Sequence, residues 1–223
     1  EISACLVGSE MCIRDRNGTS LRNYDNNYRG FTTLREAITN SINVVTVKTL
    51  TEIGTQVGFD YLDDFGFTTI VPEDNTQSLC LGGLTKGVYN LELTAAYATI
   101  ANGGTYTKPR FFTKILDHDG NVLIDNTPQT HTVLKDTTAW LITSAMKDVM
   151  TQGTGVAANI SNMPVAGKSG TTTKNRDSLF AGFSPYYTCV VWGGYDDNSP
   201  LKSTRYTKNV WKAVMQRVNE GLE

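Results

Sequence analysis

The order in which helix-like and strand-like patterns follow one another constrains the fold of this chain more than any other feature. Helical periodicities come first, and apolar residues recur at helical spacing from residue 34 onward. Short stretches rich in aromatic and β-branched residues follow in residues 178–195, where they are typical of neighbouring antiparallel strands. We therefore predict an α+β fold in which helices flank a mainly antiparallel sheet.

Local patterns predict where the individual elements lie. Thr33 and Glu36 form a T-x-x-E capping box, which opens a helix. Asp119 and Gly120 form the turn of a predicted hairpin. Further helices are predicted over residues 56–65, 90–101, 137–150 and 210–218, with Asn90 as a cap, and strands over residues 165–170, 178–183 and 188–195.

The apolar run that follows the capping box is interrupted by the polar tetrapeptide Asn40-Ser41-Ile42-Asn43. Small polar side chains compete for backbone hydrogen bonds and favour a break or a cap. We therefore predict a turn between two helices at this point. A structural helix break alone would explain the tetrapeptide, so it becomes a candidate site only together with a second motif.

Composition excludes several classes of protein. Hydrophobic residues make up 39% and charged residues 19% of the 223 residues, which is typical of a globular domain and not of a disordered tail. The formal charge of −2 argues against nucleic acid as a partner. No apolar run approaches the roughly 18 residues of a membrane span. Four cysteines at irregular spacing and two histidines argue against a zinc site, so we predict neither a metal ion nor a cofactor.

The first sixteen residues lack the periodic hydrophobic patterns of the rest of the chain. They show no helical or alternating period, and the stretch CLVGSEMCIRD resembles a translated sequencing-adapter junction. We therefore expect residues 1–16 to be a non-native junction segment, and residues 17–223 to be the C-terminal part of a longer domain. A natural terminus without regular structure is the alternative.

Lys168-Ser169-Gly170-Thr171 stands at the end of a predicted strand and carries the most specific chemistry in the chain. The lysine supplies positive charge, and two hydroxyl groups flank a glycine whose missing Cβ lets a substrate backbone approach closely. This combination suits the carboxylate of a peptide-like ligand that lies along the strand. The string is short, however, and a surface turn would explain it equally well on its own.

The two motifs together carry a resemblance. An S-x-N (Ser41, Asn43) followed downstream by K-[ST]-G is typical of serine acyltransferases that also use S-x-x-K. Three long stretches extend the match: NYDNNYRGFTTLREAITNSINVVTVKTL (23–50), GLTKGVYNLELTAAYATIANGGTYTKPRFFTKILDHDGNVL (83–123) and AGKSGTTTKNRDSLFAGFSPYYTCVVWGGYDD (166–197). The chain resembles the transpeptidase domain of a class A, bifunctional penicillin-binding protein. The resemblance implies a β-lactamase/transpeptidase-like fold that is incomplete at its N-terminus.

The resemblance also implies roles for individual residues. The family transfers the penultimate D-Ala of a peptidoglycan stem peptide to a serine and then to a neighbouring amine, and β-lactams mimic the D-Ala-D-Ala end. Ser41 would relay a proton toward the leaving nitrogen with the help of Lys168. Asn43 would bind the substrate amide. Ser169 and Thr171 would bind the terminal carboxylate beside Gly170, and the Thr171 N–H would donate to the oxyanion.

The nucleophile of the family is missing from its expected place, because no S-x-x-K string precedes Ser41. Two strings follow it, at Ser144–Lys147 and at Ser199–Lys202. Ser144 and Lys147 are expected to point away from the apolar stripe of their helix, toward solvent. Since an exposed lysine is a poor base at neutral pH, we expect the chain alone to be catalytically inert.

Two alternatives remain at this point: a β-lactamase-like hydrolase, and a non-catalytic cell-wall-binding module on the same scaffold. The resemblance also implies a location at the outer face of the bacterial cytoplasmic membrane. It places a membrane tether and a glycosyltransferase domain in the longer parent protein, and neither segment is expected in this chain.

Overall fold

The computed structural model describes residues 6–7 and 21–222. The predicted junction segment, residues 1–16, lies outside the described residues except for the backbone of strand β1. The helices are α1 Leu34–Asn40, α2 Asn43–Ile53, α3 Thr55–Asp64, α4 Asn90–Ala101, α5 Asp136–Thr151 and α6 Tyr206–Val218; the strands are β1 Leu6–Val7, β2 Thr32–Thr33, β3 Thr105–Thr107, β4 Lys114–Leu116, β5 Val122–Asp125, β6 Thr130–Thr132, β7 Ala166–Thr171, β8 Asp177–Phe183 and β9 Thr188–Gly194.

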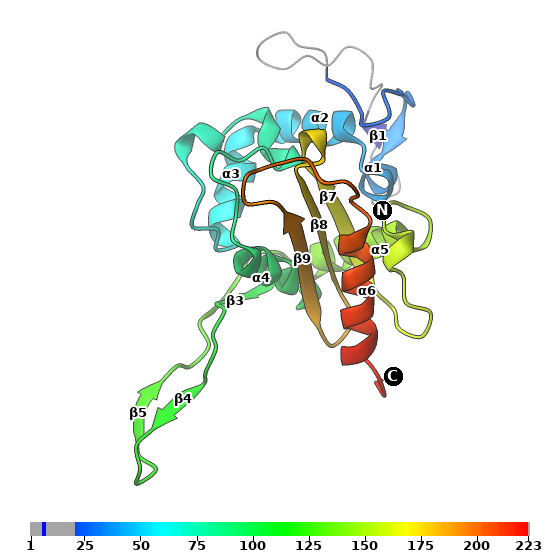
Figure 1. The fold of residues 1–223 in the computed structure, drawn as a ribbon. Helices are drawn as coiled ribbons and strands as arrows, with labels where there is room; N and C mark the ends of the chain where they lie inside the picture. Colours follow the sequence, from blue (N-terminus) through cyan, green and yellow to red (C-terminus); the bar gives the residue numbers. More distant parts are fainter. Residues whose placement is uncertain (1–5, 8–20, 223) are drawn as a thin grey trace.

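The centre of the fold is a three-stranded antiparallel sheet in the order β7-β8-β9, which confirms the predicted pairing of β8 with β9. Helix α6 packs on one face of this sheet, and α4 and α5 pack on the other face (Figure 1). In the register of β7 with β8, Ser169 lies opposite Phe180 and Lys168 lies opposite Ala181. Because side chains alternate along a strand, Lys168 and Ser169 project from opposite faces of the sheet.

The largest hydrophobic core lies between the sheet and α6. Phe180 of β8 and Trp211 of α6 are both fully buried, and their rings meet edge to face at a centroid distance of 5.1 Å. The indole Nε1 of Trp211 donates to the Cys189 carbonyl at 2.9 Å, so the polar end of the ring is satisfied as well. A second cluster, on the α4 and α5 face, includes Met146, Ala166 and Phe183.

The interrupted helical run folds as predicted. Thr33 and Glu36 form both hydrogen bonds of the capping box at the start of α1. Ser41 adopts a left-handed conformation with φ of 55°, which ends α1, and α2 begins two residues later. Ile42, between the helices, is 1% exposed and packs with Ala37 and Val45, so the break is anchored by an apolar side chain.

Two local predictions need correction. Asn90 does not cap α4: the cap position is Tyr89, and Asn90 lies in the first turn, where its Nδ2 donates to the Val190 carbonyl at 3.2 Å. The side chain that local propensity assigns to a helix cap therefore forms a tertiary hydrogen bond to β9 instead. Helix α6 begins at Tyr206, ahead of the predicted residue 210, because Thr207 is buried against the sheet.

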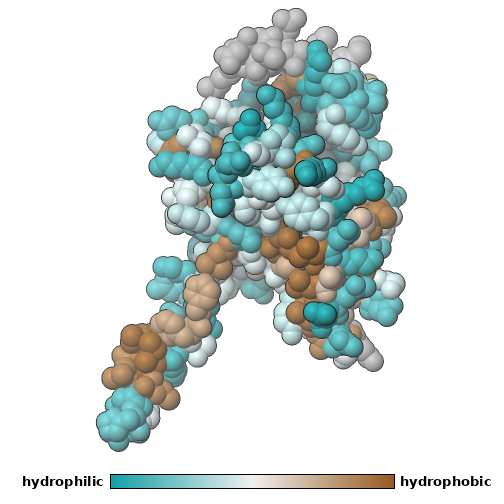
Figure 2. All heavy atoms as spheres, viewed as in Figure 1, coloured by the Kyte–Doolittle hydropathy of each residue, from teal (hydrophilic) through white to brown (hydrophobic). Residues whose placement is uncertain are grey.

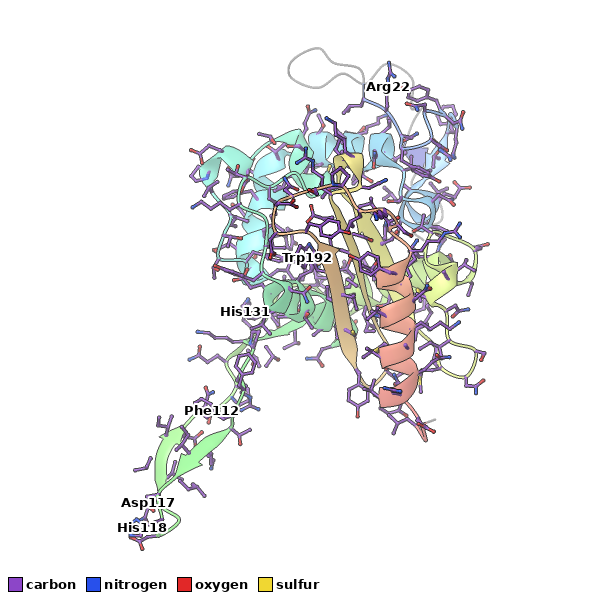
Figure 3. All side chains as sticks on the ribbon, in the orientation of Figure 1. Arg22, Phe112, Asp117, His118, His131 and Trp192 are labelled. Carbon is purple, nitrogen blue, oxygen red and sulfur yellow. The ribbon has the colours of Figure 1, made fainter. Side chains whose placement is uncertain are left out.

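A long arm projects from the body of the molecule between α4 and α5 (Figure 1). It consists of the β3–β6 pair near the body and the predicted β4–β5 hairpin beyond it, with Gly120 in the turn at φ of 86°. Figure 2 shows apolar residues gathered on this arm, and Figure 3 places Phe112 midway along it and His118 at its tip. Leu116, Leu123 and Ile124 of the hairpin are each about half exposed or more.

Replacing Trp211 with alanine should destabilise the protein strongly, because the change empties the core between the sheet and α6. We expect the free energy of unfolding to fall by about 3–5 kcal/mol, measured by urea denaturation with circular dichroism. Trp140→Ala is the matched control, since Trp140 is 67% exposed and should cost much less. Equal losses in the two variants would show that the core lies elsewhere.

Candidate active site

The turn between α1 and α2 meets the central sheet through one hydrogen bond. Lys168 Nζ donates to Ser41 Oγ at 2.8 Å, although 127 positions separate the two residues. The left-handed backbone at Ser41 turns its hydroxyl out of the helical run and toward β7. The two motifs that the sequence singled out are therefore direct neighbours in space.

Lys168 lies in a setting that disfavours its charge. It is partly buried, and burial lowers its pKa to about 8, with a smaller contribution from the positive charge of Lys208. Its ammonium group donates to the Ser169 carbonyl at 3.0 Å as well as to Ser41. A lysine in this state gives up a proton far more readily than an exposed lysine, so Lys168 can exchange a proton with the Ser41 hydroxyl.

Two hydroxyl groups occupy the other face of β7. The register puts Ser169 and Thr171 on the face that carries α6, and a 2.8 Å hydrogen bond joins Ser169 Oγ to Thr154 Oγ1. Between them, a Cβ on Gly170 would meet only the Leu179 side chain, at an ordinary 3.6 Å. Packing within the described part of the chain therefore does not demand glycine at this position, and its predicted role in close approach by a ligand stays a prediction.

Asn43 opens α2 beside Ser41. Its Nδ2 donates to the Arg22 carbonyl at 3.3 Å, so its side chain is held by the segment that precedes α1. The residue lines the same cavity as Ser41 and Ser169. Its predicted role toward a substrate amide remains a prediction.

A cavity of about 760 Å³ is lined by Ser41, Asn43, Ser169 and Thr171. Its walls come from the α1–α2 turn, the end of β7 with the residues that follow, and the start of α6. The cavity is also lined by four residues that sequence reasoning missed: Tyr24, Thr154, Lys174 and Lys208. Thr154 had a usable signal in the Gly153-Thr154-Gly155 string, because paired glycines indicate close backbone approach. In the structure, a Cβ on Gly153 would lie 2.3 Å from the Thr39 carbonyl oxygen. Lys208 had none, because it is a single lysine on an amphipathic helix.

The two downstream S-x-x-K strings do not take part in this cavity. Ser144 was expected to face solvent, and this is wrong: it is half-buried, and its Oγ accepts from Arg35 at 3.0 Å. Arg35 also pairs with Asp148 at 2.7 Å, so Ser144 belongs to a salt-bridge network between α1 and α5. Lys147 is exposed, as expected.

The second string is equally remote from the cavity. Ser199 Oγ donates to Asp197 Oδ2 at 2.7 Å, and Lys202 is exposed.

In residues 6–7 and 21–222, acidic, cysteine and histidine side chains form no group of three that could hold a metal ion. Within the same residues, no helix has the length and hydropathy that a bilayer span requires.

The lowered pKa of Lys168 predicts a specific pH dependence of stability. Below pH 8 both the folded and the unfolded protein carry this charge, and the folded state bears the full cost of burying it. Between pH 8 and 10.5 the folded protein releases the proton first, so the free energy of unfolding should rise with pH, by on the order of 3 kcal/mol.

The comparison is between the wild-type chain and Lys168→Met, by urea denaturation from pH 7 to 10. The wild type should gain stability relative to the variant over this range. Lys212→Met removes the same charge outside the cavity and should follow the wild type. Parallel curves for the wild type and Lys168→Met would contradict the burial of the charge.

Known proteins are similar to this chain in both sequence and fold. A family model described as the penicillin binding protein transpeptidase domain matches residues 13–216. Penicillin-binding protein 1F of Bacillus subtilis is 36% identical over 209 residues, which cover 89% of this chain and 29% of the relative. Penicillin-binding protein 1A of Clostridium botulinum is 34% identical over 206 residues, covering 90% of this chain and 25% of the relative. The chain thus spans less than a third of the length of these curated relatives.

Solved structures agree on the architecture. PonA1 from Mycobacterium tuberculosis superposes with a TM-score of 0.85 at 22% identity, covering 98% of this chain and 64% of that one. Penicillin-binding protein 1A from Haemophilus influenzae superposes with a TM-score of 0.80 at 20% identity, covering 98% and 39%. These likenesses confirm the predicted α+β transpeptidase fold. Because the family model matches residues 13–216, which are most of the chain, the chain belongs to the penicillin-binding protein transpeptidase domain family, in its class A branch.

Proposed function

We propose that this chain forms the proton-transfer and substrate-binding side of a peptidoglycan D,D-transpeptidase site. The observation that carries the proposal is the 2.8 Å hydrogen bond from Lys168 to Ser41, beside a cavity lined by hydroxyl groups. In the reaction, a serine hydroxyl attacks the penultimate D-Ala carbonyl of a stem peptide, and the terminal D-Ala leaves. An amine of a neighbouring stem then attacks the acyl-serine, which forms the cross-link and releases the serine.

Ser41 and Lys168 serve the departure of D-Ala. The peptide nitrogen must gain a proton as the bond to the carbonyl carbon breaks, and Ser41 Oγ donates it. Lys168 replaces that proton, which its lowered pKa favours. Such proton transfer contributes about 10²- to 10⁴-fold to a rate.

The end of β7 binds the substrate. Among the strands of the described residues, β7 pairs only with β8, so its other edge has no strand partner there and could take an extended peptide. Ser169 and Thr171 bind the terminal carboxylate, the Thr171 N–H donates to the oxyanion, and Asn43 binds the substrate amide. β-Lactams mimic this ligand, and solved members of the fold have been crystallised with penicillin V and with ampicillin.

We place the nucleophilic serine outside residues 1–223. Ser144 accepts a hydrogen bond from Arg35, and neither Ser144 nor Ser199 lines the cavity. The site therefore acts within a longer protein, for which we propose a glycosyltransferase domain, a membrane tether and a location at the outer face of the cytoplasmic membrane.

The 223-residue chain should not form a covalent adduct with penicillin, because neither of its S-x-x-K serines, Ser144 and Ser199, lines the cavity that the described residues form. The measurement is incubation with a fluorescent penicillin followed by a denaturing gel. A labelled band that persists in a Ser41→Ala variant and disappears in Ser144→Ala or Ser199→Ala would identify an internal nucleophile and refute its placement outside the chain.

In the full-length protein, Ser41→Ala should slow acylation by a β-lactam by about 10²- to 10⁴-fold. Ser144→Ala is the matched control and should acylate at the wild-type rate. Unchanged acylation in Ser41→Ala would remove the proposed proton-transfer role. Rapid turnover of nitrocefin by the full-length wild type would favour a hydrolase, and stem-peptide binding that is unaffected by alanine at Ser41 and Lys168 would favour a wall-binding module.

A further inference from the structure

The start of α6 is pinned beside the carboxylate-binding end of β7. Thr171 lies opposite Ser178 in the β7–β8 register, on the face that α6 covers. Ser178 Oγ shares a 2.9 Å hydrogen bond with Thr207 Oγ1 and donates to the Thr204 carbonyl at 3.0 Å. Thr207 is fully buried, so the residue that follows it, Lys208, is held at the level of Thr171.

Lys208 belongs to the same cavity as the two hydroxyl groups, on the same face of the sheet. Lys168, by contrast, projects from the opposite face and donates to Ser41. A lysine therefore projects from one face of β7, and a second lysine lies beside the other face. The one that shares a face with Ser169 and Thr171 is Lys208.

The charge of Lys208 has no counterion within the described residues. The side chain is half-buried and forms no ion pair with a carboxylate there, and no aspartate or glutamate lines that part of the cavity which the structure describes. Its charged neighbours, Lys168 and Arg205, are both positive. A partly desolvated cation among like charges is unfavourable until an anion joins it.

We propose that Lys208 binds the terminal carboxylate of the ligand, as the charged partner of the Ser169 and Thr171 hydroxyl groups. The assignment rests on the proposed function, since it takes the ligand to be a peptide that ends in D-Ala-D-Ala. It divides the work of the two lysines: Lys168 serves Ser41, and Lys208 selects ligands with a free carboxylate. Lys174, the other lysine that lines the cavity, is exposed and keeps its hydration.

The test measures binding, because binding does not need the nucleophile. An N-acetylated peptide that ends in D-Ala-D-Ala, as the free acid and as the C-terminal amide, is titrated into the 223-residue chain and followed by two-dimensional ¹⁵N NMR. The variants are Lys208→Gln and Lys212→Gln. Lys212 lies one turn further along α6, so its loss makes the same change in charge outside the cavity.

The wild type should bind the free acid more tightly than the amide. Lys208→Gln should weaken binding of the free acid by about 10- to 100-fold, the usual range for a hydrogen bond to a charged group. Binding of the amide should not change, and Lys212→Gln should match the wild type for both peptides. A spectrum with wild-type dispersion verifies that Lys208→Gln is folded.

Three outcomes would overturn the assignment, and they differ from one another. If Lys208→Gln keeps the preference for the free acid, Lys208 does not bind the carboxylate, while the proposed function stands. If Lys212→Gln weakens the free acid equally, only the overall positive field matters. If the wild type binds neither peptide, the proposed function fails and the assignment fails with it.

Discussion

The hydrogen bond between Lys168 and Ser41 is the contact on which the rest of the site depends. It joins a turn between two helices to a sheet that forms much later in the chain. For this contact to exist, α1 must end at Ser41 and α2 must start again at Asn43, and both requirements are met by a left-handed serine and a buried Ile42. A continuous helix would carry Ser41 on its regular helical path and would lose the turn that directs its hydroxyl to β7.

The alternation of side chains along β7 divides the chemistry between two faces of one strand. Lys168 faces the helical turn and loses much of its preference for a proton, because the fold buries it. Ser169 and Thr171 face α6, where neutral hydroxyl groups stand beside Lys208. One short strand can thus serve both proton transfer and anion binding, because successive residues of a strand point in opposite directions.

Local sequence patterns predicted the elements well where the backbone itself carries the pattern. The capping box of α1, the break at Ser41, the hairpin turn at Gly120 and the three strands of the central sheet all lie where they were expected. The wrong predictions concern polar side chains that hydrogen-bond to a segment far away in the sequence. Asn90 donates to β9 instead of capping its helix, and Ser144 accepts from Arg35 of α1 instead of facing solvent.

The amino-acid sequence by itself determined the α+β class, the helix break, the strand ends and the two motifs, because each depends on residues close together in the chain. Only the tertiary structure decided which groups share a cavity. The distance from Lys168 to Ser41, the lowered pKa of the lysine, the support of Ser169 by Thr154 and the place of Lys208 all depend on packing between segments far apart in sequence. Burial and proximity are properties of the folded chain, and no local pattern records them.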